Sequence, residues 1–172
     1  MWYNESFEGA SPPSKRGQLS VDTSVNGGVR LAGPERSAAL TTAIKSSIVR
    51  VIPGQYTIGQ LQPGVTVPHG ALLTFNDEVE TTVVYRTDLW PTELSAKDSR
   101  GPYSVIRLVL SRPFVVVGFI AAATKAVSAA GINQLTFATY SFDYIFVQSQ
   151  DLVVALKGLQ AAGFTVATED VL

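Results

Sequence analysis

The chain has 172 residues, enough for one domain or for two small domains that share a core. Its residues are 46% hydrophobic and 16% charged with a net charge of −1, which describes a globular chain without the basic excess of a nucleic-acid-binding surface. The chain contains no cysteine, which excludes disulfides, thiolate metal sites and a cysteine nucleophile.

The N-terminal residues MWYNESFEG have neither the basic start nor the apolar core of a secretory signal. The most apolar window, residues 114–123, is about half the ~20 residues that a membrane span requires. We therefore expect a soluble, cytoplasmic protein, and the lack of cysteine fits that location.

Residues 1–46 differ in composition from the rest of the chain. Proline and glycine pairs at 12–13, 27–28 and 33–34 break any period, and serine and threonine fill the positions between them. Such a composition buries too little apolar surface to offset the entropy of ordering the chain. We expect a largely flexible arm, with a helical turn or two in short pieces such as Ser37–Lys45 and one docking segment near Trp2 and Tyr3.

Residues 47–99 are expected to form an N-terminal lobe made mostly of strands. Pro53-Gly54 indicates a turn between the first two strands, and Asn76-Asp77 suits the hairpin between the last two. This stretch shows no helix of ten or more residues, so the lobe cannot cover its own sheet and must share a sheet with its neighbour or stack against it. Enrichment in β-branched and aromatic residues predicts strands at 48–52, 56–61, 72–75 and 81–85.

Residues 100–172 predict a C-terminal domain with the order β-α-β-β-α-β, beyond a boundary marked by Pro91 and Gly101-Pro102. An apolar stripe at helical spacing indicates a helix over 119–130 that ends at Gly131, and Ser149 is expected to cap a second helix. The four strands are predicted at 104–110, which continues extended through 114–117, and at 135–138, 142–147 and 164–167. The fold class is therefore α+β and ferredoxin-like, with two helices on one face of an antiparallel sheet.

Asp143 is the exception inside the most strand-like part of this domain. Burying a carboxylate in an otherwise apolar strand costs on the order of several kcal/mol unless the carboxylate is paired, hydrogen-bonded or hydrated. Two interpretations stay open at this point. Asp143 either caps its own turn, as aspartate does readily, or holds a cation of a ligand.

The stretch LTFATYSFDYIFVQSQDLVVAL at 135–156 resembles the ACT-domain family, and within it the cytosolic arginine sensors of the CASTOR type and their small bacterial relatives. The segment VIPGQYTIGQL at 51–61 is similar to the first lobe of that subgroup, so the resemblance implies tandem ACT-like lobes over roughly 47–165. The subgroup pattern runs through two strands into a helix that opens with an acidic residue and leucine. The matching residues here are Ala138, Thr139, Tyr140, Asp143, Tyr144, Phe146, Val147, Asp151 and Leu152.

The resemblance implies a small regulatory domain that binds an amino acid and forms a homodimer. The ligand carboxylate would take backbone N–H groups at the start of the first helix, since these groups lack partners within the helix and favour anions. The ligand ammonium would meet the turn between the two central strands and the carboxylate of Asp143. The implied site residues are Val116, Gly118, Phe119, Ile120, Thr139, Tyr140 and Asp143.

Val116 departs from the pattern of the arginine sensors, which have an acidic residue two positions before the helix-opening glycine. Without that carboxylate a guanidinium ligand loses a bidentate partner. We therefore expect the side-chain pocket to favour an apolar or neutral group over arginine.

Several chemistries find no support in the sequence. His69 is the single histidine and lies in a proline-rich loop, no G-x-S-x-G segment presents a serine, and no phosphate-binding loop is present. The acidic cluster at 77–80 is read as a solvated edge or, at most, a weak divalent-cation site. We expect an amino-acid-binding sensor with no catalysis and no cofactor, or alternatively a protein-interaction module whose ligand pocket is empty.

Overall fold

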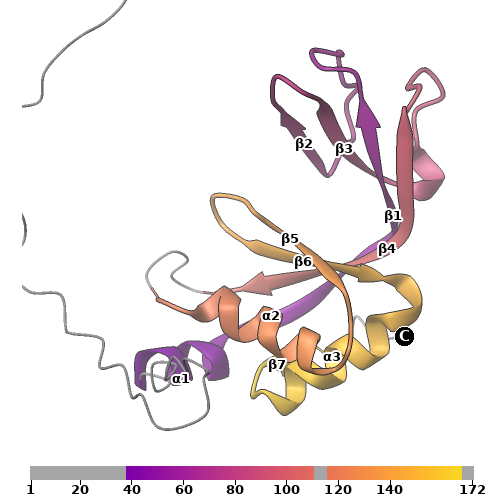
Figure 1. Cartoon of the computed structure of the whole chain (residues 1–172). Coiled ribbons are helices and arrows are strands. Elements are labelled where there is room, and N and C mark those ends of the chain that lie inside the picture. Colours follow the sequence, from indigo (N-terminus) through magenta and orange to yellow (C-terminus); the bar gives the residue numbers. More distant parts are fainter. Residues whose placement is uncertain (1–37, 111–115, 168–172) are drawn as a thin grey trace, which may run out of the picture. The chain divides into compact units, whose positions relative to one another are not determined.

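The computed structural model describes residues 38–110 and 116–167 of the chain (Figure 1). The α-helices are α1 (Ala38–Ser46), α2 (Phe119–Ala129) and α3 (Leu152–Ala161), and short 3-10 turns occupy Thr87–Leu89 and Ser149–Asp151. The strands are β1 (Ile48–Leu61), β2 (Leu73–Asn76), β3 (Thr81–Arg86), β4 (Asp98–Val109), β5 (Gln134–Ala138), β6 (Asp143–Gln148) and β7 (Thr165–Val166). All described residues belong to one compact unit.

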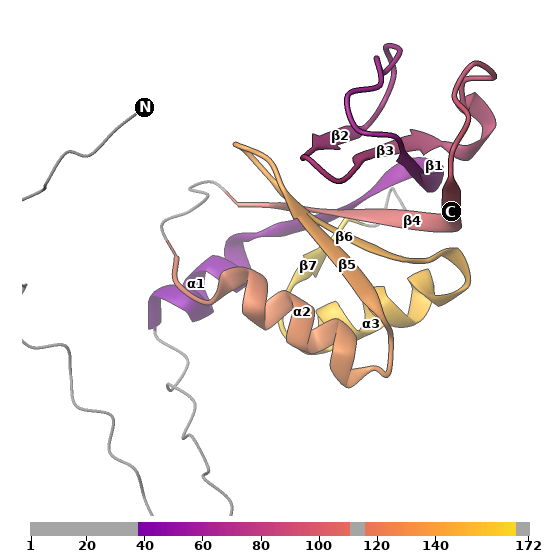
Figure 2. The same cartoon turned by 45° about the horizontal axis from the view of Figure 1, so that its top comes forward.

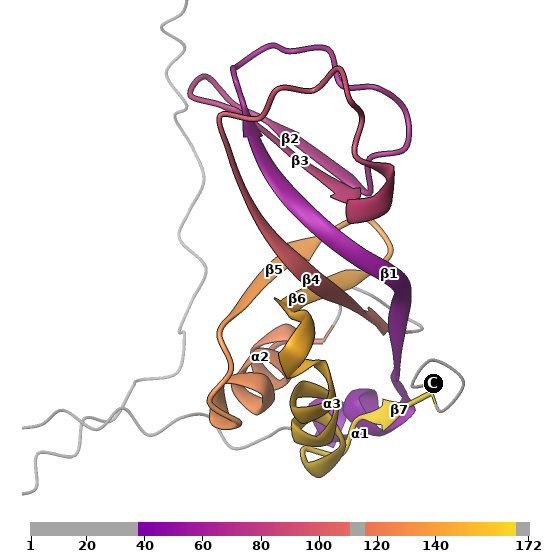
Figure 3. The same ribbon diagram turned by 90° about the vertical axis from the view of Figure 1, so that its right-hand side faces the viewer.

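A seven-stranded sheet runs in the order β2-β3-β1-β4-β6-β5, and β7 pairs with β1. The long strands β1 and β4 connect its two ends, as Figure 3 shows. The first half of β1 lies between β4 and β7, and its second half lies between β4 and β3. Every pairing is antiparallel except that of β1 with β7, which is parallel.

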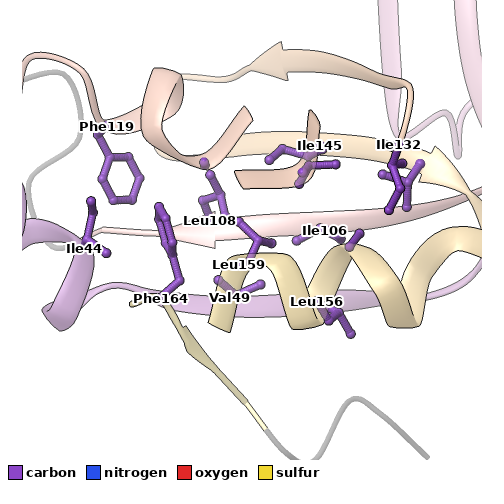
Figure 4. Close-up of a cluster of buried hydrophobic side chains, with 14 of the residues drawn as sticks. Ile44, Val49, Ile106, Leu108, Phe119, Ile132, Ile145, Leu156, Leu159 and Phe164 are labelled. Atoms are coloured by element: carbon purple, nitrogen blue, oxygen red, sulfur yellow. The ribbon is translucent and has the colours of Figure 1, made fainter. Parts of the chain in front are cut away.

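The helices lie on one face of the part of the sheet formed by β4, β6 and β5, and the hairpin of β2 and β3 lies toward the other face (Figure 2). Apolar side chains from this face of the strands and from all three helices form the main core (Figure 4). Its fully buried members include Ile44, Val49, Ile106, Leu108, Val127, Ile145, Val147 and Leu159.

A second buried cluster lies on the opposite face of the sheet. There, side chains of the N-terminal strands pack against those of β4, β5 and β6, which joins the two expected lobes through apolar contact. The ring of Phe146 is 2% exposed and makes an edge contact with Phe137 at 5.2 Å between centroids. A third cluster around Tyr85 and Trp90 lies beneath the loops of the N-terminal lobe.

The α+β class, the antiparallel sheet and the placement of helices on one face agree with the sequence prediction. Helix α2 ends at Ala129, and Gly131 takes the left-handed conformation with φ of +79° just beyond it, as predicted. The hairpin of β5 and β6 also forms within one residue of its predicted bounds.

The structure corrects the expected division between strands 48–52 and 56–61. Both belong to one strand, β1, because Pro53-Gly54 is accommodated by an irregularity in the pairing between Ile52 and Tyr56 instead of a chain reversal. Gly101-Pro102 likewise lies inside β4, so the expected boundary at residues 99–100 falls within a strand. Glycine is required at 101 because a Cβ there would come within 2.9 Å of the carbonyl oxygen of Tyr56.

Residues 38–46 form α1, which agrees with the short helical piece expected at Ser37–Lys45. The expectation that this part of the arm is flexible is wrong, because the side chains of Ala43 and Ile44 are buried in the main core and that burial stabilises the helix. Residues 1–37, including Trp2 and Tyr3, lie outside the described residues.

Two further local predictions are wrong. Residues 116–118 form a turn instead of the end of a strand, with the side chain of Val117 93% exposed. Ser149 does not cap α3, because it opens a 3-10 turn and its hydroxyl accepts a hydrogen bond from Ser104 at 3.2 Å. No helix among the described residues is long and apolar enough to cross a membrane.

Candidate functional site

The start of α2 carries four of the predicted site residues. Gly118 precedes the helix with φ of +88°, a left-handed conformation that glycine adopts without strain, and no side chain caps the helix. The N–H of Phe119 donates to the carbonyl of Val116 at 3.4 Å, and the N–H of Ala122 donates to the carbonyl of Gly118 at 2.9 Å. A ligand at this point would therefore compete with a weak hydrogen bond for the Phe119 N–H.

The side chain of Phe119 belongs to the main core, and those of Val116 and Ile120 are partly buried against it. The ring of Phe119 is 5% exposed and packs against Phe164 at 5.7 Å between centroids (Figure 4). Leu40 of α1 lies against Gly118, since a Cβ on that glycine would be 3.4 Å from the Leu40 Cδ2 atom. Phe119 therefore offers a ligand its backbone only.

The turn between β5 and β6 carries the other predicted site residues. Its hydrogen bonds come from Thr139, whose N–H donates to the carbonyl of Phe142 at 2.8 Å and whose hydroxyl accepts the Phe142 N–H at 3.2 Å. Tyr140 is 90% exposed at the tip. The turn is thus held by Thr139, so the interpretation in which Asp143 caps it is wrong.

Asp143 opens β6 opposite Leu108 of β4 and Ala138 of β5. Because side chains alternate along a strand and Ile145 lies in the main core, the Asp143 carboxylate is on the face of the sheet that carries the helices. Desolvation by burial raises the pKa of Asp143 above its ordinary value. Within the described part of the chain, no cation or hydrogen-bond donor is paired with this carboxylate.

The sheet topology brings these two groups of residues to one end of the C-terminal lobe. Strand β4 ends at Val109, opposite the start of β6, and the chain returns into α2 at the same end (Figure 1). A helix start and a carboxylate, neither of which has a side-chain partner among the described residues, are thus placed at one end of one face. Residues 111–115, which connect β4 to α2, are outside the described residues.

A cleft of about 270 Å³ lies elsewhere, in the N-terminal lobe beside β5. Its carboxylate Glu80 accepts hydrogen bonds from the Gln60 amide and from the Thr82 hydroxyl, the latter at 2.8 Å. Acidic, basic and apolar groups therefore share this cleft, whose lining includes Ile58, Gln60, Glu80, Thr82, Asp98, Arg100 and Leu135.

The sequence reasoning did not identify this cleft. Its polar residues come from β1, from β3 and the residue before it, and from the start of β4, and only the pairing of these strands brings them together. The acidic cluster has local roles: Asp77 accepts the N–H groups of Val79 and Glu80, each at 2.8 Å. Among the described residues, no three histidine or carboxylate side chains gather where they could hold a metal ion.

Residues 98–161 match the family model of the ACT domain. No curated protein matches the chain in sequence. Among solved structures, a protein from Agrobacterium tumefaciens is similar with a TM-score of 0.60 and 20% identity, over 70% of this chain and 92% of that one. A Vibrio cholerae protein of unknown function, described as a possible transport protein, gives a TM-score of 0.60 and 22% identity, over 73% and 96% of the two chains.

The ligand-free regulatory subunit of aspartate kinase from Thermus thermophilus is also similar, with a TM-score of 0.51 and 12% identity, over 69% of this chain and 97% of that subunit. At these identities the likeness shows the fold alone. Together with the family match, it shows that the described unit has the ACT-domain fold, a mixed α+β arrangement like that of an aspartate kinase regulatory subunit.

Proposed function

We propose that this chain is a regulatory module of the ACT type that binds a free amino acid and has no catalysis of its own. The observation that carries the proposal is the carboxylate of Asp143, which has no partner among the described residues and lies on the helix-bearing face at the end where α2 begins. A partly buried carboxylate without a partner is a costly arrangement, and a ligand ammonium would remove that cost.

The proposed ligand spans the two groups at this end of the sheet. Its carboxylate takes the backbone N–H groups at the start of α2 and replaces the weak hydrogen bond from Phe119 to Val116, at a point where the helix dipole favours negative charge. Its ammonium meets Asp143 and a backbone carbonyl of Thr139 or Tyr140. Val116 supplies no acidic partner for a guanidinium, so the ligand has an apolar or neutral side chain instead of that of arginine, the ligand of CASTOR-type sensors.

The test is calorimetric titration of the chain and its Asp143→Asn variant with leucine, isoleucine, arginine and lysine. Loss of a charge-assisted contact worth about 1.5–3 kcal/mol should weaken binding roughly 10- to 150-fold. The matched control is Arg100→Gln, which changes a charge in the cleft of the N-terminal lobe and should leave the affinity unchanged.

Three results would contradict this site. If Arg100→Gln weakens binding and Asp143→Asn does not, the amino acid lies in the cleft. Tight arginine binding that survives Asp143→Asn would contradict both the site and its selectivity. If none of the twenty amino acids raises the melting temperature, the fold serves protein interaction with an empty pocket, because any ligand of the folded state must stabilise it.

We also propose that two copies pair. Strands β5 and β2 are the outer strands of the sheet order, and unpaired strand edges favour association with another chain. Sedimentation of the chain at tens of micromolar should give the mass of two chains. The mass of a single chain would contradict the dimer without affecting the ligand proposal.

A further inference from the structure

Two arginines lie directly opposite each other on the face of the sheet away from the helices. Arg50 of β1 is paired in register with Arg107 of β4. Directly opposed residues of an antiparallel pair have their Cβ atoms about 4.5–5.5 Å apart on one face, and like charges in that position repel. An anion bound between the two guanidinium groups would relieve this repulsion.

Among the residues that the structure describes, no side chain supplies such an anion. Within the described residues, neither arginine forms an ion pair, and neither guanidinium group donates a hydrogen bond to a protein acceptor. The Nε atom of Arg107 is buried and has no hydrogen-bond partner there. Asp143, the nearest carboxylate in the strand register, projects from the opposite face. The residues that share the face of the arginines on β1, β4 and β6 are uncharged: Ile48, Ile52, Val105, Val109, Phe142, Tyr144 and Phe146.

Aromatic side chains hold one of the two arginines in place. The guanidinium carbon of Arg107 lies 4.9 Å from the centroid of the Phe142 ring, a cation–π contact. Tyr144 is the register partner of Arg107 on β6, and its ring packs with the second buried cluster. Arg107 is thus half-buried on an aromatic support, whereas Arg50 is exposed and accessible.

We propose that Arg50 and Arg107 form a binding site for a small multivalent oxyanion, either a phosphate or a di- or tricarboxylate. Two planar guanidinium groups provide forked donors that match the oxygens of such groups, and two positive charges call for at least two negative ones. The aromatic rings beside Arg107 provide an apolar surface for an organic part of the ligand. This site lies on the face opposite to Asp143 and does not depend on the amino-acid site.

The experiment is thermal denaturation of the full chain with pyrophosphate, citrate or sodium chloride at equal ionic strength. Pyrophosphate or citrate should raise the melting temperature, and sodium chloride should not match that rise. The stronger of the two oxyanions identifies the ligand as a phosphate or a carboxylate. A rise no larger than that from sodium chloride overturns the proposal.

The deciding variant is Arg50→Gln, which changes an exposed side chain and is expected to fold. Without oxyanion it should melt at the same temperature as the parent or higher, because the repulsion is gone, and its affinity for the oxyanion should fall about tenfold or more. Arg100→Gln, an exposed arginine at the other end of β4, should respond as the parent does. An equal loss of response in Arg100→Gln, or a lower melting temperature of Arg50→Gln without oxyanion, contradicts the site.

Discussion

At the scale of single residues, Asp143 links stability to pH. Burial raises its folded-state pKa above the ordinary value of 3.8, so the folded chain holds this proton more tightly than the unfolded chain does. Between the two pKa values the folded state binds more protons, and stability therefore falls as the pH rises through that window. The loss of folding stability is complete at pH values above the pKa of the folded state and absent at pH values below the pKa of the unfolded state.

We predict that Asp143→Asn, without ligand, is as stable as the parent at neutral pH or more stable by up to about 0.5 kcal/mol. The difference should disappear at about pH 3, where the aspartate is protonated in both states. Urea denaturation at the two pH values measures it. Thr139→Val is the contrasting variant: it removes the hydroxyl that holds the turn and should lose about 1 kcal/mol at both pH values.

A large loss of stability in Asp143→Asn at neutral pH would show that the carboxylate supports its own turn after all.

The sequence identified Asp143 because a charge inside an aromatic strand is conspicuous. It could not assign the turn to Thr139, since threonine and aspartate both accept backbone N–H bonds and only the geometry distinguishes them. The opposed arginines were equally visible, in IVRVI and VIRLV, but their pairing depends on the strand register.

At the scale of elements, the sequence predicted a short helical piece at Ser37–Lys45, close to the observed α1, but did not predict that it docks into the main core. Helices α2 and α3 have apolar stripes that match the helical period, so they were predictable from sequence alone. Helix α1 has few large apolar residues, and its preceding segment is rich in helix breakers. Its stability comes from the docking of Ile44 beside Phe119 and Phe164, a tertiary contact that no local pattern contains (Figure 4).

We predict that Ile44→Ala destabilises the chain by about 2–5 kcal/mol, because Ile44 is 1% exposed and its loss leaves a cavity in the main core. Urea denaturation gives the free energy of unfolding. The matched control is Leu89→Ala, whose side chain is 60% exposed and whose truncation should change stability by no more than about 0.5 kcal/mol. A similarly small effect of Ile44→Ala would mean that α1 is not part of the folded core.

At the scale of the whole described unit, β1 and β4 determine how the two lobes depend on each other. Each strand contributes one half to the N-terminal lobe and the other to the C-terminal lobe, and the second buried cluster packs side chains of both lobes together. Neither lobe can separate without breaking strand pairs and exposing that cluster. The sequence predicted the strands but not their continuity, because a proline-glycine pair indicates a chain reversal unless a bulge accommodates it.

We predict that the two lobes unfold in one cooperative transition. Trp90 reports on the N-terminal lobe, where its ring contacts Tyr85 at 5.8 Å between centroids and its indole N–H donates to the carbonyl of Leu94 at 3.3 Å. The far-ultraviolet circular dichroism of the helices reports on the C-terminal lobe. In a Trp2→Phe background, which leaves Trp90 as the single fluorescent indole, both signals should give the same midpoint and slope in urea, as a two-state transition requires. Two separate midpoints would show that each lobe is stable alone, and would mean that the shared strands β1 and β4 bend at the irregularity near Pro53 without transmitting stability across it.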